Sequence, residues 1–395
     1  MINIAILGFG VVGSGVAEVI KENSDSLSEK LSGEEICVKY ILDKRSFPEH
    51  ALGNRVTMDF DMILNDPEVI VVVETMGGSH PAYEFSKRAL EAGKNVVTSN
   101  KEVVANFGTE LLSIARENNV NYLFEASVGG GIPIIRPMWQ CLAANKIESV
   151  TGILNGTTNF ILTKMISEGM DFEEALKLAQ SLGYAEANPA ADIEGIDTCR
   201  KICILASLAF GKTVLPENVH CEGISDITLE DMTAAEALGY SIKLLGRAEN
   251  TDDGIYVITA PFLVGYDNPM AGVNDVYNAI TVCGNAVGDI MFYGKGAGKL
   301  PTASAVVADI VDIARECKKN IIWSFSKDNP VTDYRSAKTR FFVRTEDPRA
   351  KEYFPGCVFC DSENGEYAFI TDEDKESRLS ERLTGFSVIS KIRVL

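Results

Sequence analysis

Two periodicities of apolar residues alternate over the first 130 residues. Short, nearly continuous apolar runs such as Ile2–Leu7 and Val69–Glu74 have the length and composition of strands that are buried on both faces. After the first run, Val16, Val19 and Ile20 recur at the three- to four-residue spacing of a helix face. Strands that alternate with helices predict an α/β domain with a doubly wound parallel sheet over residues 1–130.

Strands and helices follow in mixed order after this point, which is typical of an α+β domain. We expect this second domain to cover residues 131–320 and to be followed by a distinct tail over 336–395. Strands are predicted at 149–154 and 255–263, and helices at 172–181, 197–210, 234–247 and 302–317.

The composition narrows the range of partners. The chain has 395 residues, a net charge of −19 and a pI of about 4.7, which argues against nucleic acids and anionic membranes. Its apolar runs are far too short to span a bilayer, and its N-terminus lacks the basic region of a signal peptide. The nine cysteines are scattered, and a single CxxC at Cys357–Cys360, with no second one and only three histidines, argues against a zinc site. We therefore expect a cytoplasmic protein with reduced thiols that acts on a small molecule.

The first strand runs directly into a GxGxxG motif, and a helical pattern follows it. The motif binds a dinucleotide when a strand precedes it and a helix follows it, as is the case here. Gly8 permits the tight turn, Gly10 lets the backbone approach a pyrophosphate, and Gly13 lets the helix pack closely on the strand. A glycine turn that binds no nucleotide is the alternative. The candidate cofactor residues here are Gly8, Phe9, Gly10, Val11, Val12 and Gly13.

The second strand, Ile36–Leu42, ends in three charged residues that bear on the choice of coenzyme. An acid at this point usually binds the ribose hydroxyls of NAD, whereas a nearby basic residue accepts the 2′-phosphate of NADP. Asp43 favours NAD, and Lys44 and Arg45 favour NADP, so the sequence leaves both coenzymes open. A solvated turn is the other interpretation of the two basic residues.

Two further candidates follow strands whose ends should meet at one edge of the sheet. Thr75 comes directly after Val69–Glu74, and Lys101 closely follows a strand predicted at 95–98. Ligands of open parallel sheets bind at the carboxyl ends of the strands. Thr75 and Lys101 are therefore candidate cofactor contacts, although a lysine in this position is also an ordinary start of a helix.

A stretch rich in charged residues precedes the apolar segment 202–210. Asp197 and Lys201 are four residues apart, so they share one face of a helix with the acid N-terminal to the base. A lysine at the edge of a core, beside a carboxylate, is well placed to exchange protons with a bound substrate. The same stretch holds further acids that are either substrate ligands or solvated side chains: Glu186, Asp192 and Glu194.

These motifs, in this order, resemble those of the homoserine dehydrogenase family from residue 1 to about 320. The resemblance implies NAD(P)-dependent interconversion of L-homoserine and L-aspartate 4-semialdehyde, in the threonine and methionine branch of amino-acid biosynthesis. It also implies a homodimer or larger homo-oligomer, and a return of residues 302–320 to the first domain. The matching segments are 8–13, 98–101, 124–134, 152–162, 183–201, 294–298 and 301–305.

The resemblance assigns roles to the charged residues. Lys201 matches the acid/base lysine of the family, and Lys101 a second lysine of the active site. Asp197 matches the acid beside the catalytic lysine, and Glu186 the acid that contacts the polar end of the substrate. Asp192 occupies another charged position of the family site.

The resemblance also implies a monovalent cation, Na⁺ or K⁺. Glu125 and the backbone around Val128, Gly130 and Ile132 match the family's cation site, where carbonyl oxygens and one carboxylate suit a hard cation. Gly298 matches a glycine loop near the nicotinamide end of the coenzyme.

A lysine is the candidate proton donor because none of the three histidines falls in these motifs. Free lysine titrates near about 10.4, which is high for an acid/base group at neutral pH. Partial burial or a second cation would lower the pKa of Lys201, whereas Asp197 would raise it, so the net direction stays open.

Residues 336–395 resemble a shortened ACT domain, a regulatory module with βαββαβ order. The segments 339–344, 367–371, 375–383 and 388–394 match its first strand and its last strand, helix and strand, whereas the first helix and second strand are largely missing. The tail is expected either to bind an effector such as threonine or to have a structural or dimer-supporting role.

Two other functions remain open at this point: another Rossmann oxidoreductase with an appended α+β domain, and a non-catalytic nucleotide sensor. Aspartate-semialdehyde dehydrogenase is disfavoured because the chain shows no nucleophilic cysteine paired with a histidine. The set Glu186, Asp197 and Lys201 argues against a sensor, which has no need of it.

Overall fold

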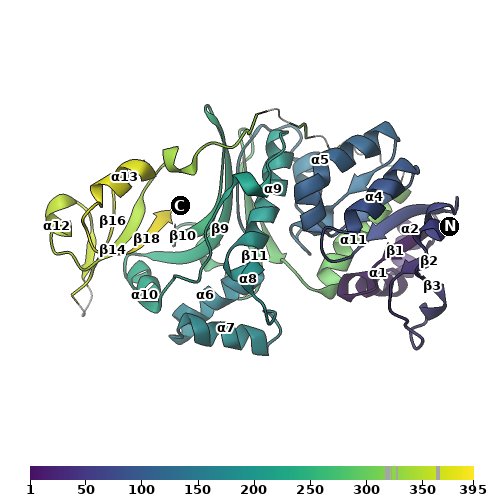
Figure 1. Ribbon diagram of the computed structural model, residues 1–395, viewed down its shortest axis with the longest axis horizontal. Helices are drawn as coiled ribbons and strands as arrows, with labels where there is room; N and C mark the ends of the chain where they lie inside the picture. Colours follow the sequence, from purple (N-terminus) through teal and green to yellow (C-terminus); the bar gives the residue numbers. More distant parts are fainter. Residues whose placement is uncertain (316–320, 322, 326–327, 362–364) are drawn as a thin grey trace. The chain divides into compact units, whose positions relative to one another are not determined.

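The computed structural model describes residues 1–315, 321, 323–325, 328–361 and 365–395 (Figure 1). The chain divides into two compact units, each made of several segments. The first unit contains Met1–Lys146, Cys203–Pro216 and Gly294–Asp328, and the second contains Ile147–Ile202, Glu217–Tyr293 and Asn329–Leu395. These bounds differ from the expected domains, because residues 131–146 group with the first unit and the tail groups with the second.

Within the described residues, the first unit is built on a six-stranded parallel sheet of order β3-β2-β1-β4-β5-β6. The order reverses between β1 and β4, and Leu7 of β1 lies beside Leu42 and Glu74 at this switch point. This arrangement confirms the predicted doubly wound fold. The strands are β1 (Ile2–Leu7), β2 (Ile36–Leu42), β3 (Val56–Thr57), β4 (Val69–Glu74), β5 (Asn95–Thr98) and β6 (Tyr122–Leu123).

Helices cover this sheet, and a late segment of the chain takes part. A Cβ on Gly15 of α1 would lie 3.0 Å from the Lys299 backbone oxygen and 3.1 Å from the Ala303 Cβ in α11, which is tighter than ordinary van der Waals contact. The two helices therefore pack closely although 276 residues lie between them in sequence. The helices are α1 (Val11–Glu22), α2 (Ser24–Lys30), α3 (Phe60–Leu64), α4 (Ala82–Glu91), α5 (Lys101–Glu117) and α11 (Lys299–Ala314).

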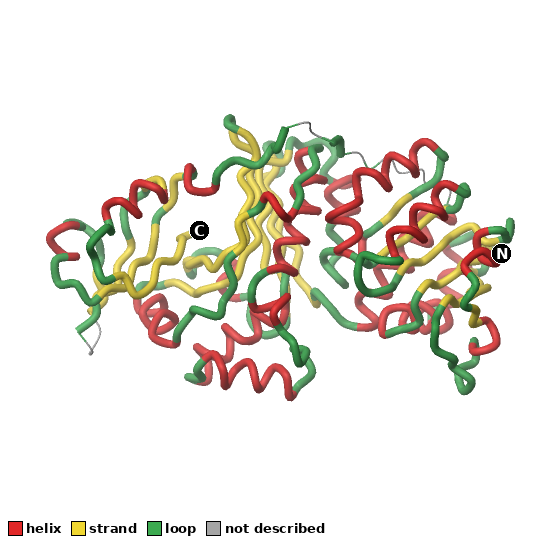
Figure 2. The backbone as a smooth tube through the Cα atoms, in the orientation of Figure 1, coloured by secondary structure: helices red, strands yellow, loops and turns green. Residues whose placement is uncertain are grey.

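The second unit contains a mixed sheet that is ten-stranded as far as the chain is described, and Figure 2 shows its strands in yellow. Its path is β12-β11-β7-β9-β10-β18-β14-β16-β15, and β8 pairs with β10. The strands before the tail are β7 (Ile147–Ile153), β8 (His220–Cys221), β9 (Tyr240–Thr251), β10 (Gly254–Gly265), β11 (Tyr277–Gly284) and β12 (Gly288–Lys295).

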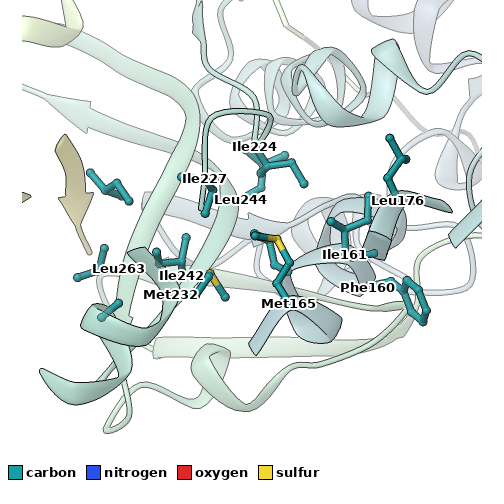
Figure 3. Close-up of a cluster of buried hydrophobic side chains, with 14 of the residues drawn as sticks. Phe160, Ile161, Met165, Leu176, Ile224, Ile227, Met232, Ile242, Leu244 and Leu263 are labelled. Atoms are coloured by element: carbon teal, nitrogen blue, oxygen red, sulfur yellow. The ribbon is translucent and has the colours of Figure 1, made fainter. Parts of the chain in front are cut away.

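Apolar helices cover one face of this sheet. Phe160 and Met165 of α6 pack with Leu244 of β9 and Leu263 of β10 in one buried cluster (Figure 3). Three strands of the tail contribute to the same cluster, so the tail and the rest of the unit share one core. The helices are α6 (Gly156–Glu168), α7 (Phe172–Ser181), α8 (Ala190–Ile193), α10 (Leu229–Ala237) and α9 (Ile196–Phe210), which begins in this unit.

The predicted helix over 234–247 is wrong. The helix α10 ends at Ala237, Gly239 follows with φ +86°, and the strand β9 begins at Tyr240. Five consecutive residues from Ile242 are buried in the sheet, so the apolar run lacks the alternation that marks a half-exposed strand. A run of this kind fits a helix or a strand by period alone.

The tail contains all six elements of a βαββαβ module, two of them very short. The helix and second strand that the sequence analysis found largely missing are α12 (Ala350–Tyr353) and β15 (Phe359–Asp361). The remaining elements are β14 (Phe341–Thr345), β16 (Tyr367–Ile370), α13 (Glu376–Arg382) and β18 (Val388–Val394). The tail joins the larger sheet because β18 pairs with β10.

No helix in the described part of the chain is long and apolar enough to cross a membrane.

Candidate active site

The glycine motif forms the turn between β1 and α1. Gly8 has φ +88°, and a Cβ on Gly13 would lie 2.1 Å from the Gly8 carbonyl oxygen and 2.8 Å from Thr75 Oγ1. Only glycine therefore fits at position 13 without a shift of the backbone. A Cβ on Gly10 would meet nothing within 4 Å, so this position opens outward. The turn thus leaves space at Gly10, beside the N-terminus of α1, where a pyrophosphate binds in folds of this type.

Asp43 and Arg45 form one paired group at the end of β2. Asp43 accepts hydrogen bonds from the Phe9 backbone N–H at 2.8 Å, and Arg45 donates to both of its carboxylate oxygens at 3.0 and 2.8 Å. The Arg45 guanidinium lowers the pKa of Asp43 well below its usual range. Asp43 therefore supports the glycine turn while Arg45 offsets its charge.

A pocket of about 450 Å³ lies over this turn. Its lining includes His50 and Lys299, which the sequence analysis did not select. Lys44 is exposed and does not line this pocket. No sequence motif marks His50 or Lys299, because loop 46–52 and α11 reach the turn only through the fold. The lining residues are Phe9, Gly10, Val11, Ser14, Arg45, Phe47, His50 and Lys299.

The remaining candidates of the first unit lie at strand or helix ends. Thr75 follows β4 and donates from Oγ1 to the Gly8 carbonyl at 2.8 Å, so it holds the glycine turn. Lys101 is the first residue of α5 and is half-buried. Val12 is half-buried in α1, and Gly298 precedes α11 with φ +124°.

Glu74 is a polar residue of this edge that the sequence analysis did not select. It is fully buried and accepts hydrogen bonds from Met76 N–H at 2.7 Å and from Thr98 Oγ1 at 2.6 Å. Burial raises the pKa of Glu74 to about 7, against the effect of these donors. Its carboxylate therefore links the loop after β4 to the end of β5. The sequence did carry one signal for this residue, because Glu74 is an acid that ends an otherwise apolar strand.

Replacing Glu74 with glutamine is expected to stabilise the protein at pH 8 and to change little below pH 5. The native state binds a proton at Glu74 up to about pH 7, whereas an unfolded glutamate loses it near about 4.3, so native stability falls as the pH rises through this window. The cost at pH 8 is on the order of 3 kcal/mol. Thermal midpoints of both proteins at pH 5 and pH 8 measure the effect. Parallel pH profiles for the two proteins would contradict it.

The Glu125 carboxylate is engaged by the backbone. Its Oε1 accepts from Ile134 N–H at 2.6 Å and Ile135 N–H at 2.9 Å, and its Oε2 accepts from Arg136 N–H at 2.7 Å. Glu125 thus satisfies the start of the helical turn that follows, as a capping acid does. The sequence analysis instead expected this carboxylate to bind a cation.

Main-chain oxygens crowd the glycine loop that follows Glu125. A Cβ on Gly129 would lie 2.3 Å from the Ile132 carbonyl oxygen, and a Cβ on Gly130 would lie 2.3 Å from the Gly296 carbonyl oxygen. Val128 and Ile132 are buried beside them. Carbonyl oxygens are the kind of ligand that a hard cation prefers.

In the second unit, the Asn155 side chain joins the charged residues predicted for catalysis. Its Nδ2 donates to Asp192 Oδ1 at 2.8 Å and to Asp197 Oδ2 at 2.9 Å. Lys201 Nζ donates to the same Asp197 oxygen at 2.8 Å and to the Leu154 carbonyl at 2.7 Å. Asp197 and Lys201 are buried, and Asp192 is half-buried. The structure therefore brings Asp192, Asp197 and Lys201 together around one amide.

Local sequence explains this arrangement. Asn155 is the N-cap of α6, and its Oδ1 accepts from the Thr158 N–H at 2.9 Å, which fixes the side chain at the end of β7. Gly195, with φ +79°, makes the turn between α8 and α9. Asp197 then lies in the first turn of α9, where a negative charge is favourable. The sequence analysis included Asn155 only within the matching segment 152–162 and gave it no role of its own.

The other acids of this stretch lie elsewhere. Glu186 is exposed, and its backbone oxygen accepts from Gln180 Nε2 at 3.2 Å. Glu194 is also exposed, and its Oε1 accepts from Ser225 Oγ at 2.8 Å. The structure thus assigns Glu194 a contact within the unit, whereas the Glu186 carboxylate faces solvent.

Comparisons with known proteins agree with this site. The family model described as "Homoserine dehydrogenase, NAD binding domain" matches residues 8–125, and the model described as "Homoserine dehydrogenase" matches residues 133–311. A homoserine dehydrogenase of Synechocystis is 44% identical over 84% of this chain and 76% of its own length. One of Bacillus subtilis is 43% identical over 81% of this chain and 74% of its own.

Solved structures extend the likeness to the whole chain. The crystal structure of a homoserine dehydrogenase from Thiobacillus denitrificans has a TM-score of 0.90 and 36% identity, and covers 100% of this chain and 98% of that one. A hyperthermophilic archaeal homoserine dehydrogenase in complex with NADPH has a TM-score of 0.70 and 30% identity, with coverages of 81% and 99%.

Both domains of the family and relatives above 40% identity match, so this chain belongs to the homoserine dehydrogenase family of NAD-binding oxidoreductases.

Proposed function

We propose that Lys201 is the acid/base residue with which this homoserine dehydrogenase interconverts L-homoserine and L-aspartate 4-semialdehyde. The observation that carries the proposal is the placement of Lys201 Nζ, which two hydrogen bonds of 2.7 and 2.8 Å fix at the end of β7. An ammonium held in this way is a positioned proton donor.

Aldehyde reduction needs a hydride on carbon and a proton on oxygen. The nicotinamide supplies the hydride when the coenzyme is bound. Lys201 gives its proton to the carbonyl oxygen as the C–H bond forms, and it takes a proton from the alcohol in the reverse direction. Asp197 accepts a hydrogen bond from the Lys201 ammonium and so orients it. Asn155 in turn holds Asp197 and Asp192 beside each other.

Glu186 is proposed to bind the ammonium group of the amino-acid substrate. It is an exposed carboxylate in the chain segment that leads to Asp192 and Asp197. Glu186→Gln should raise the KM for L-homoserine by about fivefold and leave kcat within about threefold, because an exposed ion pair is worth roughly 1 kcal/mol. Steady-state kinetics test this, with Glu173→Gln on α7 as a control that should match the wild type. An unchanged KM for L-homoserine would count against the contact.

Lys101 enters the proposal through the family resemblance alone, as the second lysine of the reaction. Gly298 is proposed to lie near the nicotinamide on the same ground. The glycine turn with Thr75 and the Asp43–Arg45 pair is proposed to bind the rest of the coenzyme, which is supported by the pocket over that turn.

We propose NADP(H) as the preferred coenzyme. Arg45 offsets the negative charge of Asp43, which would otherwise repel a 2′-phosphate. A relative was solved in complex with NADPH.

A monovalent cation is proposed at the loop after Glu125. Main-chain oxygens of Glu125, Val128, Gly130 and Ile132 would hold it, since the Glu125 carboxylate already accepts three backbone N–H groups. The ion would contribute fixed positive charge at this loop.

A cytoplasmic location and a homodimer or larger homo-oligomer complete the proposal, and both rest on the sequence and the family resemblance.

The test is absorbance at 340 nm with purified protein, L-homoserine and either NAD⁺ or NADP⁺, at alkaline pH with Na⁺ or K⁺ present. Reduction that depends on L-homoserine and is faster with NADP⁺ is expected. Folded protein that binds nucleotide but reduces neither coenzyme would favour another substrate or a nucleotide sensor.

A further inference from the structure

The segment 220–225 lies directly against residues 193–195, which follow Asp192 at the end of α8. Ile224 N–H donates to the Ile193 carbonyl at 2.8 Å, Cys221 Sγ to the Glu194 carbonyl at 3.2 Å, and Ser225 Oγ to Glu194 Oε1 at 2.8 Å. This segment is also anchored in the core, because Ile224 is fully buried in the cluster of Figure 3.

Gly223 of segment 220–225 and Gly195 of residues 193–195 each pack tightly against the backbone of the other segment. A Cβ on Gly223 would lie 2.2 Å from the Ile193 carbonyl oxygen and 2.6 Å from the Glu194 Cα. A Cβ on Gly195 would lie 2.9 Å from the Glu222 carbonyl oxygen. With backbone against backbone on both sides, a shift of segment 220–225 has to move residues 193–195.

Residues 193–195 lie between the two carboxylates of the site. Asp192 precedes them, Asp197 follows them at the start of α9, and the Asn155 amide binds both carboxylates. The Asp197 oxygen that accepts from Asn155 also accepts from Lys201. Movement of the 193–195 loop would therefore disturb the Lys201 ammonium.

The tail contacts segment 220–225 through a buried arginine that pairs with Glu222. Arg393 of β18 is 3% exposed and donates to both oxygens of Glu222, at 2.8 and 3.0 Å. The same guanidinium donates to Glu376 of α13 at 2.8 and 3.1 Å, and Lys391 donates to Glu376 at 2.8 Å. Although burial favours the neutral acid, Arg393 lowers the pKa of Glu222, so this carboxylate stays charged and paired.

We propose that Arg393 is a positioning residue of the substrate site, through which the C-terminal tail braces segment 220–225 against residues 193–195, which connect Asp192 of α8 to Asp197 of α9. The inference rests on the proposed function of Lys201 and extends it to the tail. The tail then has a role in forming the active site, independent of any effector.

A second buried arginine provides a matched control. Arg344 of β14 is 5% exposed and donates to Asp231 of α10 at 2.9 Å and to Glu366 at 2.7 Å. Arg344, like Arg393, is a buried arginine of the tail that pairs with a carboxylate outside the tail. Its partner Asp231 is on α10, however, and not in segment 220–225.

The experiment compares Arg393→Met, Glu222→Gln and their combination with Arg344→Met in the full-length protein. Arg393→Met is expected to raise the KM for L-homoserine or lower kcat by about tenfold, with the KM for NADP⁺ within twofold. The double variant should be little worse than Arg393→Met, because the contact between Arg393 and Glu222 is already lost in the single variant. Arg393→Lys, which keeps a cation beside Glu222, should recover much of the loss. Arg344→Met should lower the thermal midpoint and leave both kinetic constants within twofold.

Hydrogen exchange of a peptide covering residues 190–202 gives a readout that does not depend on activity. This peptide should exchange faster in Arg393→Met and Glu222→Gln but not in Arg344→Met. Unchanged exchange in both Glu222→Gln and Arg393→Met, or equal kinetic losses in Arg393→Met and Arg344→Met, would overturn the inference. If the wild type does not oxidise L-homoserine, the proposed function fails, while the exchange result still decides whether the tail braces the loop.

Discussion

Lys201→Ala is expected to lower kcat by about a thousandfold, while the dissociation constant of the coenzyme stays within twofold of the wild type. Positioned acid/base groups contribute roughly 10²- to 10⁴-fold to the rate, and Lys201 is the buried cation whose ammonium is fixed between the Leu154 carbonyl and Asp197. The proposed coenzyme residues in the turn from Gly8 to Gly13 belong to the first unit, so the substitution leaves them intact. Single-turnover kinetics and a fluorescence titration with NADPH measure the two quantities.

Two further variants separate proton transfer from loss of a buried charge. Lys201→Ala leaves the Asp197 carboxylate buried without its cation, which by itself destabilises a protein by roughly 3–5 kcal/mol. Lys201→Arg keeps a cation beside Asp197, but a guanidinium does not release a proton at accessible pH, so this variant should be folded and inactive. Lys243→Met removes a different buried lysine, whose Nζ donates to the Val273 carbonyl, and should lower the thermal midpoint with turnover reduced only a few-fold. Turnover within tenfold of the wild type in Lys201→Ala would exclude the acid/base role.

Gly13→Ala is expected to weaken coenzyme binding by at least tenfold and to lower the thermal midpoint. Its Cβ would lie 2.1 Å from the Gly8 carbonyl oxygen, so α1 has to move away from the turn that is proposed to bind the pyrophosphate. Overpacking of this kind costs roughly 1–3 kcal/mol. Thermal midpoints with and without NADPH, together with the titration, report both effects.

Gly10→Ala is the matched control in the same turn. Gly10 has φ −83°, and a Cβ there would meet nothing within 4 Å, so the unliganded protein should keep the thermal midpoint of the wild type. The added methyl group should still weaken coenzyme binding, because it points into the space that the backbone leaves open. Wild-type stability and affinity in Gly13→Ala would show that the turn is not built as described.

The sequence by itself determined the features that depend on neighbouring residues. The alternation of apolar strands with helices predicted the doubly wound sheet, and the GxGxxG spacing predicted a turn in which only glycine fits at positions 8 and 13. Asp197 and Lys201 were paired correctly on one face of α9, because four residues make about one helical turn. Each of these features follows from a local period or a local backbone requirement.

Local patterns failed where burial on both faces removed the period. The run after Gly239 became the strand β9 because β7 and β10 pair with its two edges, and no spacing within the run distinguishes that strand from a helix. The Glu125 carboxylate bonds to backbone N–H groups nine to eleven residues later, so its engagement was also invisible in the local pattern.

Only the tertiary structure decided which distant polar groups meet. Asn155 lies 37 and 42 residues from the two aspartates that it joins, Glu74 lies 24 residues from Thr98, and Arg393 lies 171 residues from Glu222. A buried polar group has to find a partner, but many partners in a sequence satisfy that need equally well. Packing of the sheet and its helices makes the choice, because it fixes which strand end, loop and tail strand come within hydrogen-bonding distance.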